Sequence, residues 1–177
     1  AIIPAVPEGV AIARMVDPQL AATMAEAVLA WTLYLHRDMP RYARQQRKAE
    51  WIEHPVVRVT GRRVGILGLG ALGTAAASTL VRHGFDVAGW SRSPKAVEGV
   101  QCFDGDAGFA TLLARSDIVV NLLPHTAATA NLLGAEAFAA MPAGGSLINF
   151  GRGQTVDDDA LIAALDRGHL DHAVLDV

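Results

Sequence analysis

A glycine-rich turn between an apolar run and a run of small residues is the feature that most constrains the fold of this chain. Gly68, Gly70 and Gly73 have the spacing G-x-G-x-x-G, after the apolar residues 63–67 and at the start of 71–83. The first glycine permits a tight turn, the second lets the backbone approach a pyrophosphate, and the third lets a helix pack closely on a strand. The alternative is a turn needed only for close packing. The pattern predicts a strand–turn–helix unit whose dinucleotide contacts are Gly68, Gly70, Ala71, Leu72 and Gly73.

From residue 61 onward, apolar runs alternate with amphipathic runs. The strand-like segments are 63–67, 86–90, 100–103, 117–122, 146–150 and 171–177. The helix-like segments between them are 71–83, 106–115, 136–141 and 156–167. Apolar strands that alternate with helices are typical of a parallel sheet covered on both faces. We predict an α/β fold, a Rossmann-type doubly wound parallel sheet, over residues 61–177.

The turn after the second predicted strand indicates which dinucleotide the chain binds. An NAD site usually has Asp or Glu here, and this chain has Ser91. A carboxylate would repel a 2′-phosphate, whereas serine does not. Arg92 can fork onto phosphate oxygens, and Ser93 and Lys95 can add donors. The turn favours NADP(H) over NAD(H), and an ordinary solvated basic turn is the alternative.

The residues before this unit contain one long helical pattern. Asp17-Pro18 is typical of an N-cap followed by proline in the first turn. Apolar residues then recur at spacings of three and four until about Met39-Pro40. Residues 1–16 are short, contain proline, and have a strand-like run at 10–16. We expect residues 1–16 to be part of another domain, and 17–60 to form a long helix and an arm.

Composition and charge exclude several classes of protein. Hydrophobic residues make up 51% of the 177 residues and charged residues 19%, which excludes a disordered or collagen-like chain. The net charge of -3 does not favour nucleic acid. The longest uncharged apolar run, residues 27–35, is too short to span a bilayer. Cys102 is the only cysteine, so no disulfide framework or cysteine metal site is expected. We expect a cytoplasmic protein with no metal, membrane or nucleic-acid partner.

Several motifs in a fixed order resemble the D-isomer-specific 2-hydroxyacid dehydrogenases, most closely their NADPH-preferring glyoxylate/hydroxypyruvate reductases. The resemblance covers roughly residues 10–177. It implies that the complete enzyme reduces a small 2-oxoacid to the 2-hydroxyacid. Besides the glycine turn and residues 90–93, the matching segments are Met24-Ala25-Glu26, Asn121-Leu122-Leu123-Pro124-His125-Thr126, Asn149-Phe150-Gly151-Arg152-Gly153 and Ala173-Val174-Leu175-Asp176-Val177.

The resemblance also implies roles for single residues. Arg152 matches the catalytic arginine that grips the 2-oxoacid carboxylate and polarises its carbonyl, and a guanidinium fork suits a carboxylate. Asp176 matches an aspartate near the nicotinamide carboxamide. Each has a purely structural role as its alternative. The other residues that the resemblance places at the cofactor are Leu123, Pro124, Phe150 and, as a donor to phosphate, Thr129.

The sequence departs from the family at both ends. The resemblance places the catalytic histidine, and the glutamate that orients it, beyond residue 177, and most of the substrate domain before the long helix. We therefore expect a cofactor domain that binds dinucleotide but turns over poorly alone. None of the six histidines is assigned as general acid. His125 lies beside the cofactor loop, and the others are expected at the surface or at helix ends.

Residues 37–48 form a basic stretch around Tyr42, with Trp51 beyond it. Three interpretations stay open: a solvated helix face, a site for nucleic acid or an acidic partner, and an arm that crosses to a second subunit with Trp51 as its anchor. The resemblance favours the last, so we expect a homodimer through residues 17–60.

Two other functions stay open. One is a non-catalytic dinucleotide-sensing module, akin to the corepressors that share this fold. The other is a β-hydroxyacid dehydrogenase, although the glycine loop of that family lies close to its N-terminus.

Overall fold

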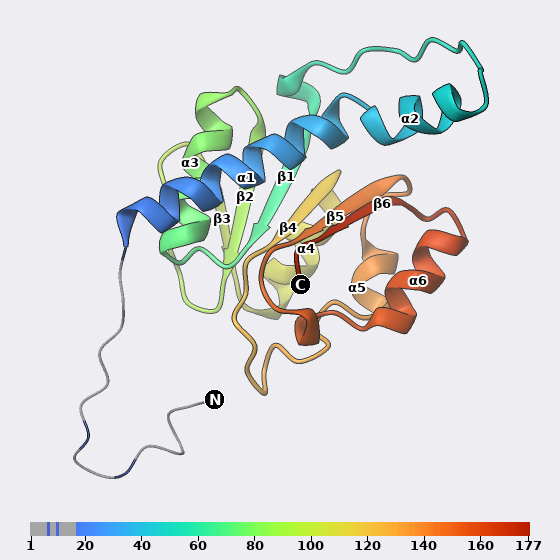
Figure 1. Ribbon diagram of the computed structural model, residues 1–177. Helices are drawn as coiled ribbons and strands as arrows, with labels where there is room; N and C mark the ends of the chain where they lie inside the picture. Colours follow the sequence, from blue (N-terminus) through green and yellow to red (C-terminus); the bar gives the residue numbers. More distant parts are fainter. Residues whose placement is uncertain (1–6, 8–9, 11–16) are drawn as a thin grey trace.

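A computed structural model describes Pro7, Val10 and residues 17–177 of the chain (Figure 1). The expectations for residues 1–16 fall almost entirely outside these residues. Strands and helices alternate from residue 63 onward, as the sequence predicts. In chain order, the elements are α1 (Pro18–His36), α2 (Met39–Arg47), η2 (Val59–Gly61), β1 (Arg63–Leu67), α3 (Ala71–Arg82), β2 (Asp86–Ser91), β3 (Gln101–Asp104), α4 (Gly105–Arg115), β4 (Ile118–Asn121), α5 (Ala135–Ala140), β5 (Gly145–Asn149), η3 (Gly153–Thr155), α6 (Asp158–Asp166) and β6 (Leu170–Leu175).

The six strands form one sheet in the order β3-β2-β1-β4-β5-β6, and every pairing is parallel. The chain builds outward from β1 to β3 and then returns to place β4 on the other side of β1. The order therefore reverses between β1 and β4 in the middle of the sheet. This is the doubly wound Rossmann-type arrangement, and it confirms the predicted fold class.

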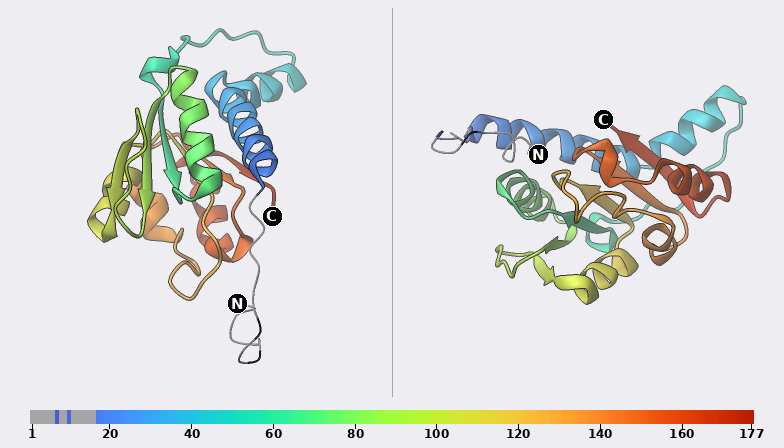
Figure 2. Two further views of the ribbon diagram at one scale, coloured as in Figure 1. Left: turned by 90° about the vertical axis from the view of Figure 1, so that its left-hand side faces the viewer. Right: turned by 90° about the horizontal axis from the view of Figure 1, so that it is seen from below.

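Side chains from alternate strand positions build two separate cores. Val64, Ile66 and Val120 belong to the core between the sheet and helices α1 and α3. Leu67 and Val119 belong to the core on the other face, under α4, α5 and α6. Figure 2 shows helices on both faces of the sheet. Burial on both faces explains why the strands read as continuous apolar runs.

Helix α1 covers one face of the sheet and packs along α3 (Figure 1). Asp17 caps it by accepting a hydrogen bond from the backbone N–H of Gln19 at 2.8 Å, as its position before Pro18 predicts. The helix ends at His36, earlier than expected. Asp38 has a left-handed backbone (φ 52°) that breaks the helix, and Pro40 lies in the first turn of α2 rather than ending α1. The basic stretch is therefore partly a second helix.

Other boundaries also differ from the predicted ones. Helix α6 begins after Asp157, which is its N-cap and whose side chain accepts from Ala160 N at 3.0 Å. Val156, expected in that helix, instead pairs with Leu133 in an isolated bridge. Strand β6 ends at Leu175, which leaves Asp176 beyond it. Each difference arises where a cap or a distant pairing replaces the continuation of a local pattern.

Two histidines differ from their expected surroundings. His172 lies within β6 and is partly buried, and its ring centroid is 6.3 Å from that of Tyr34. His36 does end a helix, but only 6% of it is exposed, and its ring packs edge-on against Phe85 with the ring centroids 5.4 Å apart. Among the described residues, no helix is long and apolar enough to cross a membrane, and no group of three or more His, Cys, Asp or Glu residues could hold a metal ion.

Candidate functional site

The carboxyl ends of β1 and β4 lie side by side at the point where the strand order reverses. In doubly wound sheets, ligands bind in the crevice outside the strand ends at this point. Here the crevice is a cleft of about 400 Å³. Three loops from distant parts of the sequence line it: residues Gly68, Gly70, Ala71, Leu72 and Gly73, then Leu122, Leu123 and Pro124, then Phe150, Gly151 and Arg152.

The three glycines of the turn meet different geometric demands. Gly68 has φ +101°, and a Cβ there would lie 3.2 Å from the carbonyl oxygen of Leu122. A Cβ on Gly73 would overlap the carbonyl oxygen of Gly68, so α3 can start this close to β1 only without a side chain at that position. A Cβ on Gly70 would meet nothing within 4 Å. The surface at Gly70 is therefore open to a ligand.

The start of α3 offers the polar contacts of the cleft. Gly70 is its N-cap residue and supplies no side-chain acceptor to the first turn. The N–H groups of that turn therefore have no side-chain acceptor, and their residues line the cleft at the positive end of the helix dipole, where phosphate groups bind well. An open Gly70 next to free donors fits the pyrophosphate of a dinucleotide.

The turn after β2 joins this site through a backbone contact. Gly68 N donates to Trp90 O at 2.8 Å, so the end of β2 lies beside the glycine turn, and the chain leaves the sheet after Ser91. Ser91 is nearly buried, and its hydroxyl donates to the carbonyl of Ser93 at 2.8 Å, which shapes the turn. Arg92, Ser93 and Lys95 are exposed. The turn thus presents cationic and hydroxyl groups where NAD sites usually have a carboxylate.

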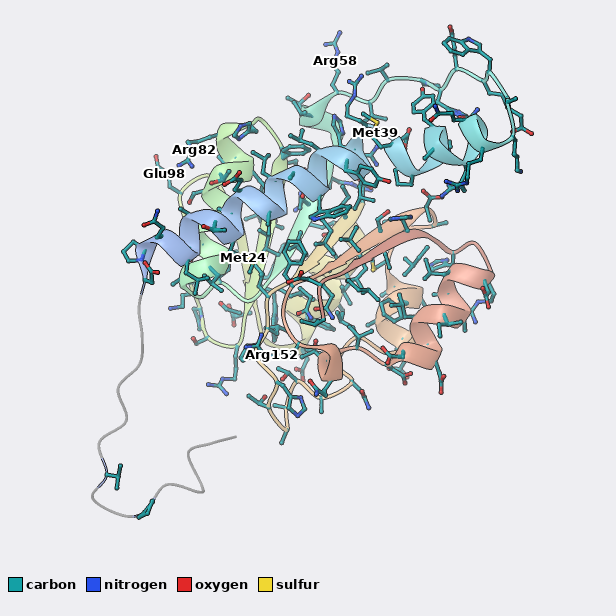
Figure 3. All side chains as sticks on the ribbon, viewed as in Figure 1. Met24, Met39, Arg58, Arg82, Glu98 and Arg152 are labelled. Atoms are coloured by element: carbon teal, nitrogen blue, oxygen red, sulfur yellow. The ribbon has the colours of Figure 1, made fainter. Side chains whose placement is uncertain are left out.

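Arg152 lies on the loop between β5 and η3, at the boundary between two cavities. It lines the glycine-turn cleft, and also a larger cavity of about 1120 Å³ that His125 and Val177 line with it. Its side chain is exposed, and Nη1 donates to Gly151 O at 2.7 Å (Figure 3). The guanidinium is therefore available to a ligand that extends from the cleft into the larger cavity.

The other expected cofactor residues occupy different positions. Leu123 and Phe150 are buried walls of the cleft, and Pro124 lies on its rim. Thr129 already uses its hydroxyl hydrogen within its own loop, since Oγ1 donates to Pro124 O at 2.6 Å. Its role as a phosphate donor stays a prediction that would require this bond to break. Asp176 is exposed just past β6 and does not line the cleft.

The structure brings together three polar residues to which the sequence interpretation gave no role. Asn121 and Asn149 end β4 and β5 opposite each other, and Thr155 lies in η3. All three are buried, and hydrogen bonds join them beneath the cleft. Both asparagines fall within the matching motifs. The signal in the sequence that could have pointed to a role for them was their position at the ends of two predicted strands.

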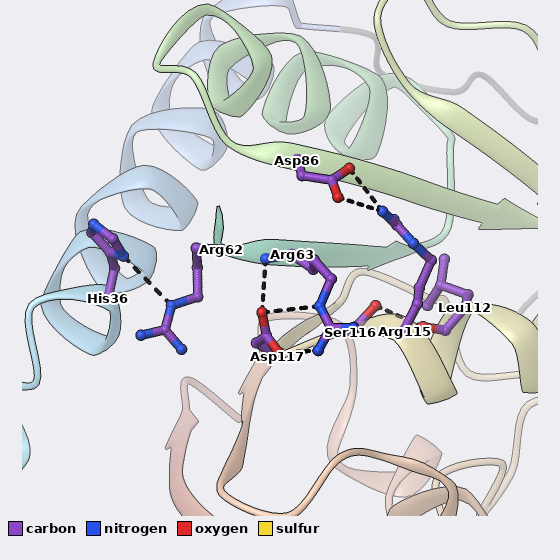
Figure 4. A network of polar contacts seen from close by, with 8 residues as sticks. All are labelled: His36, Arg62, Arg63, Asp86, Leu112, Arg115, Ser116 and Asp117. Atoms are coloured by element: carbon purple, nitrogen blue, oxygen red, sulfur yellow. Dashed lines mark hydrogen bonds and ion pairs between the residues drawn. The ribbon is translucent and has the colours of Figure 1, made fainter. Parts of the chain in front are cut away.

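A second polar network lies at the opposite end of the sheet (Figure 4). Arg63 pairs with Asp117 at 2.5 Å, and Arg115 pairs with Asp86 at 2.7 Å. Burial by itself would raise the pKa of Asp117, but hydrogen bonds from the side chain and backbone of Arg63 outweigh it and lower that pKa. These bonds tie the start of β1 to β4. The network lies away from the cleft and serves the fold.

Comparison with known proteins identifies the chain. Residues 29–177 match the sequence profile of the D-isomer specific 2-hydroxyacid dehydrogenase, NAD binding domain. The chain belongs to this family. The match confirms the resemblance seen in the motifs.

The 2-hydroxyacid dehydrogenase domain also resembles individual members of the family. A solved structure from Xanthobacter autotrophicus Py2, in complex with NADPH and MES, is 47% identical with a TM-score of 0.94, covering 99% of this chain and 73% of that one. An NADPH-dependent glyoxylate/hydroxypyruvate reductase from Sinorhizobium meliloti, in complex with NADP and sulfate, is 35% identical with a TM-score of 0.89, covering 98% and 57%.

A curated relative extends the same comparison. Glyoxylate/hydroxypyruvate reductase A of Serratia proteamaculans is 39% identical over 171 residues, which are 97% of this chain and 55% of that protein. The chain therefore spans about half the length of the curated relatives it matches.

Proposed function

We propose that this chain forms the cofactor-binding part of a reductase that uses NADPH to reduce a small 2-oxoacid, such as glyoxylate or hydroxypyruvate. The observation that carries the proposal is the position of Arg152, which lines both the glycine-turn cleft and the larger cavity beside it. A carboxylate held there would lie next to the cofactor cleft. The names of the relatives from Serratia proteamaculans and Sinorhizobium meliloti support this substrate class.

Each part of the cleft contributes to the reaction in this proposal. When bound, the reduced nicotinamide supplies a hydride. Arg152 forks onto the substrate carboxylate, fixes its orientation, and favours negative charge on the adjacent carbonyl oxygen. Leu123 and Phe150 exclude water from the floor of the cleft.

A binding experiment tests the role of Arg152. The probe is oxamate, an unreactive analogue of a 2-oxoacid, titrated calorimetrically into the chain saturated with NADPH. Arg152→Ala should weaken oxamate binding at least about tenfold, because a charge-assisted bidentate pair is lost. Arg58→Ala removes another exposed arginine, distant from the cleft, and should leave binding unchanged (Figure 3). Equal oxamate affinity in Arg152→Ala and the parent chain would contradict the proposal.

The preference for NADP(H) over NAD(H) is the finer part of the proposal. Ser91→Asp places a carboxylate where the 2′-phosphate would lie, and one unfavourable charge pair near the surface costs about 1–4 kcal/mol. We expect the Kd for NADPH to rise at least about tenfold and the Kd for NADH to change little, both measured by nicotinamide fluorescence. Ala114→Asp adds the same charge on exposed α4 as a control. A parallel change in both affinities would refute the preference.

We also propose that residues 17–60 act as a helix and arm that pair two copies of the chain, while residues 61–177 form the cofactor domain. Several apolar side chains of the arm face solvent, among them Trp51, which is 91% exposed. Exposing so large an aromatic surface to water does not stabilise a monomer, whereas protein interfaces are enriched in such residues.

A further inference from the structure

Asn121 and Asn149 occupy equivalent positions at the carboxyl ends of neighbouring strands. They are register partners in the pairing of β4 with β5, and they are 0% and 1% exposed. Burying an amide costs free energy unless its donors and acceptors are satisfied. Two buried amides side by side at the ends of these strands suggest a role beyond stability.

The two asparagines shape the loops that line the cleft. The Oδ1 atom of Asn121 accepts from Leu123 N at 3.2 Å, and the Oδ1 atom of Asn149 accepts from Gly151 N at 3.1 Å. Each side chain thus closes a turn two residues ahead of itself. The amide of Asn121 also donates to Asn149 Oδ1 at 2.9 Å. One hydrogen bond therefore joins the turn before Pro124 to the turn before Arg152.

Thr155 extends this connection to Arg152 itself. Its hydroxyl accepts from Asn121 Nδ2 at 2.7 Å and donates to the carbonyl oxygen of Arg152 at 2.6 Å. The backbone N–H of Thr155 donates to the same carbonyl at 3.1 Å. The backbone of Arg152 is thus held from both sides, by the turn from Asn149 and by Thr155.

The two loops are also in close contact at Gly151. A Cβ at this position would lie 2.7 Å from Leu123 O and 3.2 Å from Asn121 Nδ2. A side chain at Gly151 would push the two loops apart, and the hydrogen bonds hold them together. A buried polar hydroxyl elsewhere behaves differently: Ser116 bonds only within its own helix, to Leu112 O at 2.6 Å.

We propose that Asn121, Asn149 and Thr155 are positioning residues that fix Arg152 relative to the cofactor-lining loop. Through them, the guanidinium keeps a constant position with respect to the dinucleotide cleft. The proposal rests on the proposed role of Arg152 in binding a carboxylate, and it adds three buried residues to that function.

The test uses Thr155→Val, a change of similar shape that removes the hydroxyl and leaves one N–H of Asn121 without its acceptor. Thr155→Ser restores the hydroxyl. Ser116→Ala is the matched control, since it removes a buried hydroxyl at the other end of β4. Each variant is measured for NADPH binding by fluorescence, oxamate binding with NADPH saturating, and amide hydrogen exchange.

We expect Thr155→Val to weaken oxamate binding about tenfold, in line with one lost hydrogen bond and its unsatisfied partner. Exchange should also rise at the N–H groups of Leu123 and Gly151, which the valine does not touch. Thr155→Ser and Ser116→Ala should stay within about twofold of the parent chain in oxamate affinity. A purely structural role would instead raise exchange throughout the chain, or only at residue 155, and would overturn the proposal.

The same series separates this proposal from the proposed function. If Arg152→Ala loses oxamate binding while Thr155→Val keeps it, the positioning role is wrong and the role of Arg152 stands. If the parent chain binds no oxamate, or Arg152→Ala binds it as tightly, the role of Arg152 is wrong and the positioning role falls with it.

Discussion

At the scale of single residues, identical amino acids in the glycine turn are constrained by different neighbours. Gly73 is enclosed, because the carbonyl of Gly68 occupies the space a side chain would need, whereas Gly70 faces open space. The fold therefore requires glycine at Gly73, and we expect a bound ligand, rather than the fold, to require it at Gly70. Substitutions at the two positions should have separable effects.

We expect Gly73→Ala to lower the free energy of unfolding by about 1–3 kcal/mol, because α3 must move away from the turn. Gly70→Ala should leave stability unchanged or slightly raised, since its backbone (φ −78°) suits alanine, yet it should weaken NADPH binding by blocking the approach of a phosphate. Urea unfolding and NADPH fluorescence measure the two effects. Similar losses of stability in both variants would contradict this separation.

At the scale of elements, α1 is fixed over the sheet by contacts that include two histidines. His36 ends α1 against Phe85, and Arg62 Nε donates to its Nδ1 at 3.5 Å (Figure 4). Burial lowers the pKa of His36, and the positive charges of Arg62 and Arg37 lower it further, while Asp38 opposes this shift. His172 on β6 faces Tyr34 of α1, with ring centroids 6.3 Å apart. Burial lowers its pKa; the charge of Asp171 raises it and that of Arg44 lowers it. Both side chains therefore pack in their neutral form.

This packing predicts a loss of stability in mild acid. Because the folded pKa of both histidines lies below the ordinary 6.5, the unfolded chain binds more protons as the pH falls through that value. The free energy of unfolding should decrease from about pH 7 downward, by at most about 1.4 kcal/mol per pH unit for each histidine.

Urea unfolding at a series of pH values measures this slope. His36→Gln should make it shallower, while His83→Gln, which removes an exposed histidine at the end of α3, should not. An unchanged slope in His36→Gln would show that His36 does not couple protonation to the docking of α1.

At the scale of the whole molecule, the arm between α2 and η2 leaves several large apolar side chains exposed in a single chain. Trp51, Ile52 and Val56 are 91%, 53% and 74% exposed. The arm leads into the amino end of β1, whereas the glycine-turn cleft lies at the carboxyl ends of β1 and β4, so the molecule presents this apolar surface and the cleft at opposite ends of the sheet (Figure 1).

We expect the chain to dimerise through this surface. Trp51→Ser should raise the dimer dissociation constant by about tenfold or more, because a buried aromatic anchor is lost from the interface. It should not lower the stability of the monomer. Sedimentation velocity over a range of concentrations measures it. Ile162→Ser removes a similarly exposed apolar residue (56%) from α6 and should leave association unchanged. A parent chain that stays monomeric at high concentration would refute the dimer.

The sequence by itself determined the features that depend on neighbouring residues. Strand–turn–helix patterning, the glycine spacing and the cap at Asp17 all act within a few positions, so they determined the order of strands and helices from residue 61 onward and the location of the glycine-turn cleft. The motifs at residues 121–126 and 149–153 identified the family. The site residues remain predictions wherever their role depends on a bound ligand.

Only the tertiary structure decided how distant residues meet. Asn121 contacts Thr155 across 34 positions of sequence, and His36 is buried because Phe85 lies against it. The break at Asp38 likewise yields two helices where the local pattern continues as one. Such contacts depend on which side chains the sheet register and the helix packing bring together, and no local pattern encodes that choice. The position of Arg152 between two cavities is a product of the same packing.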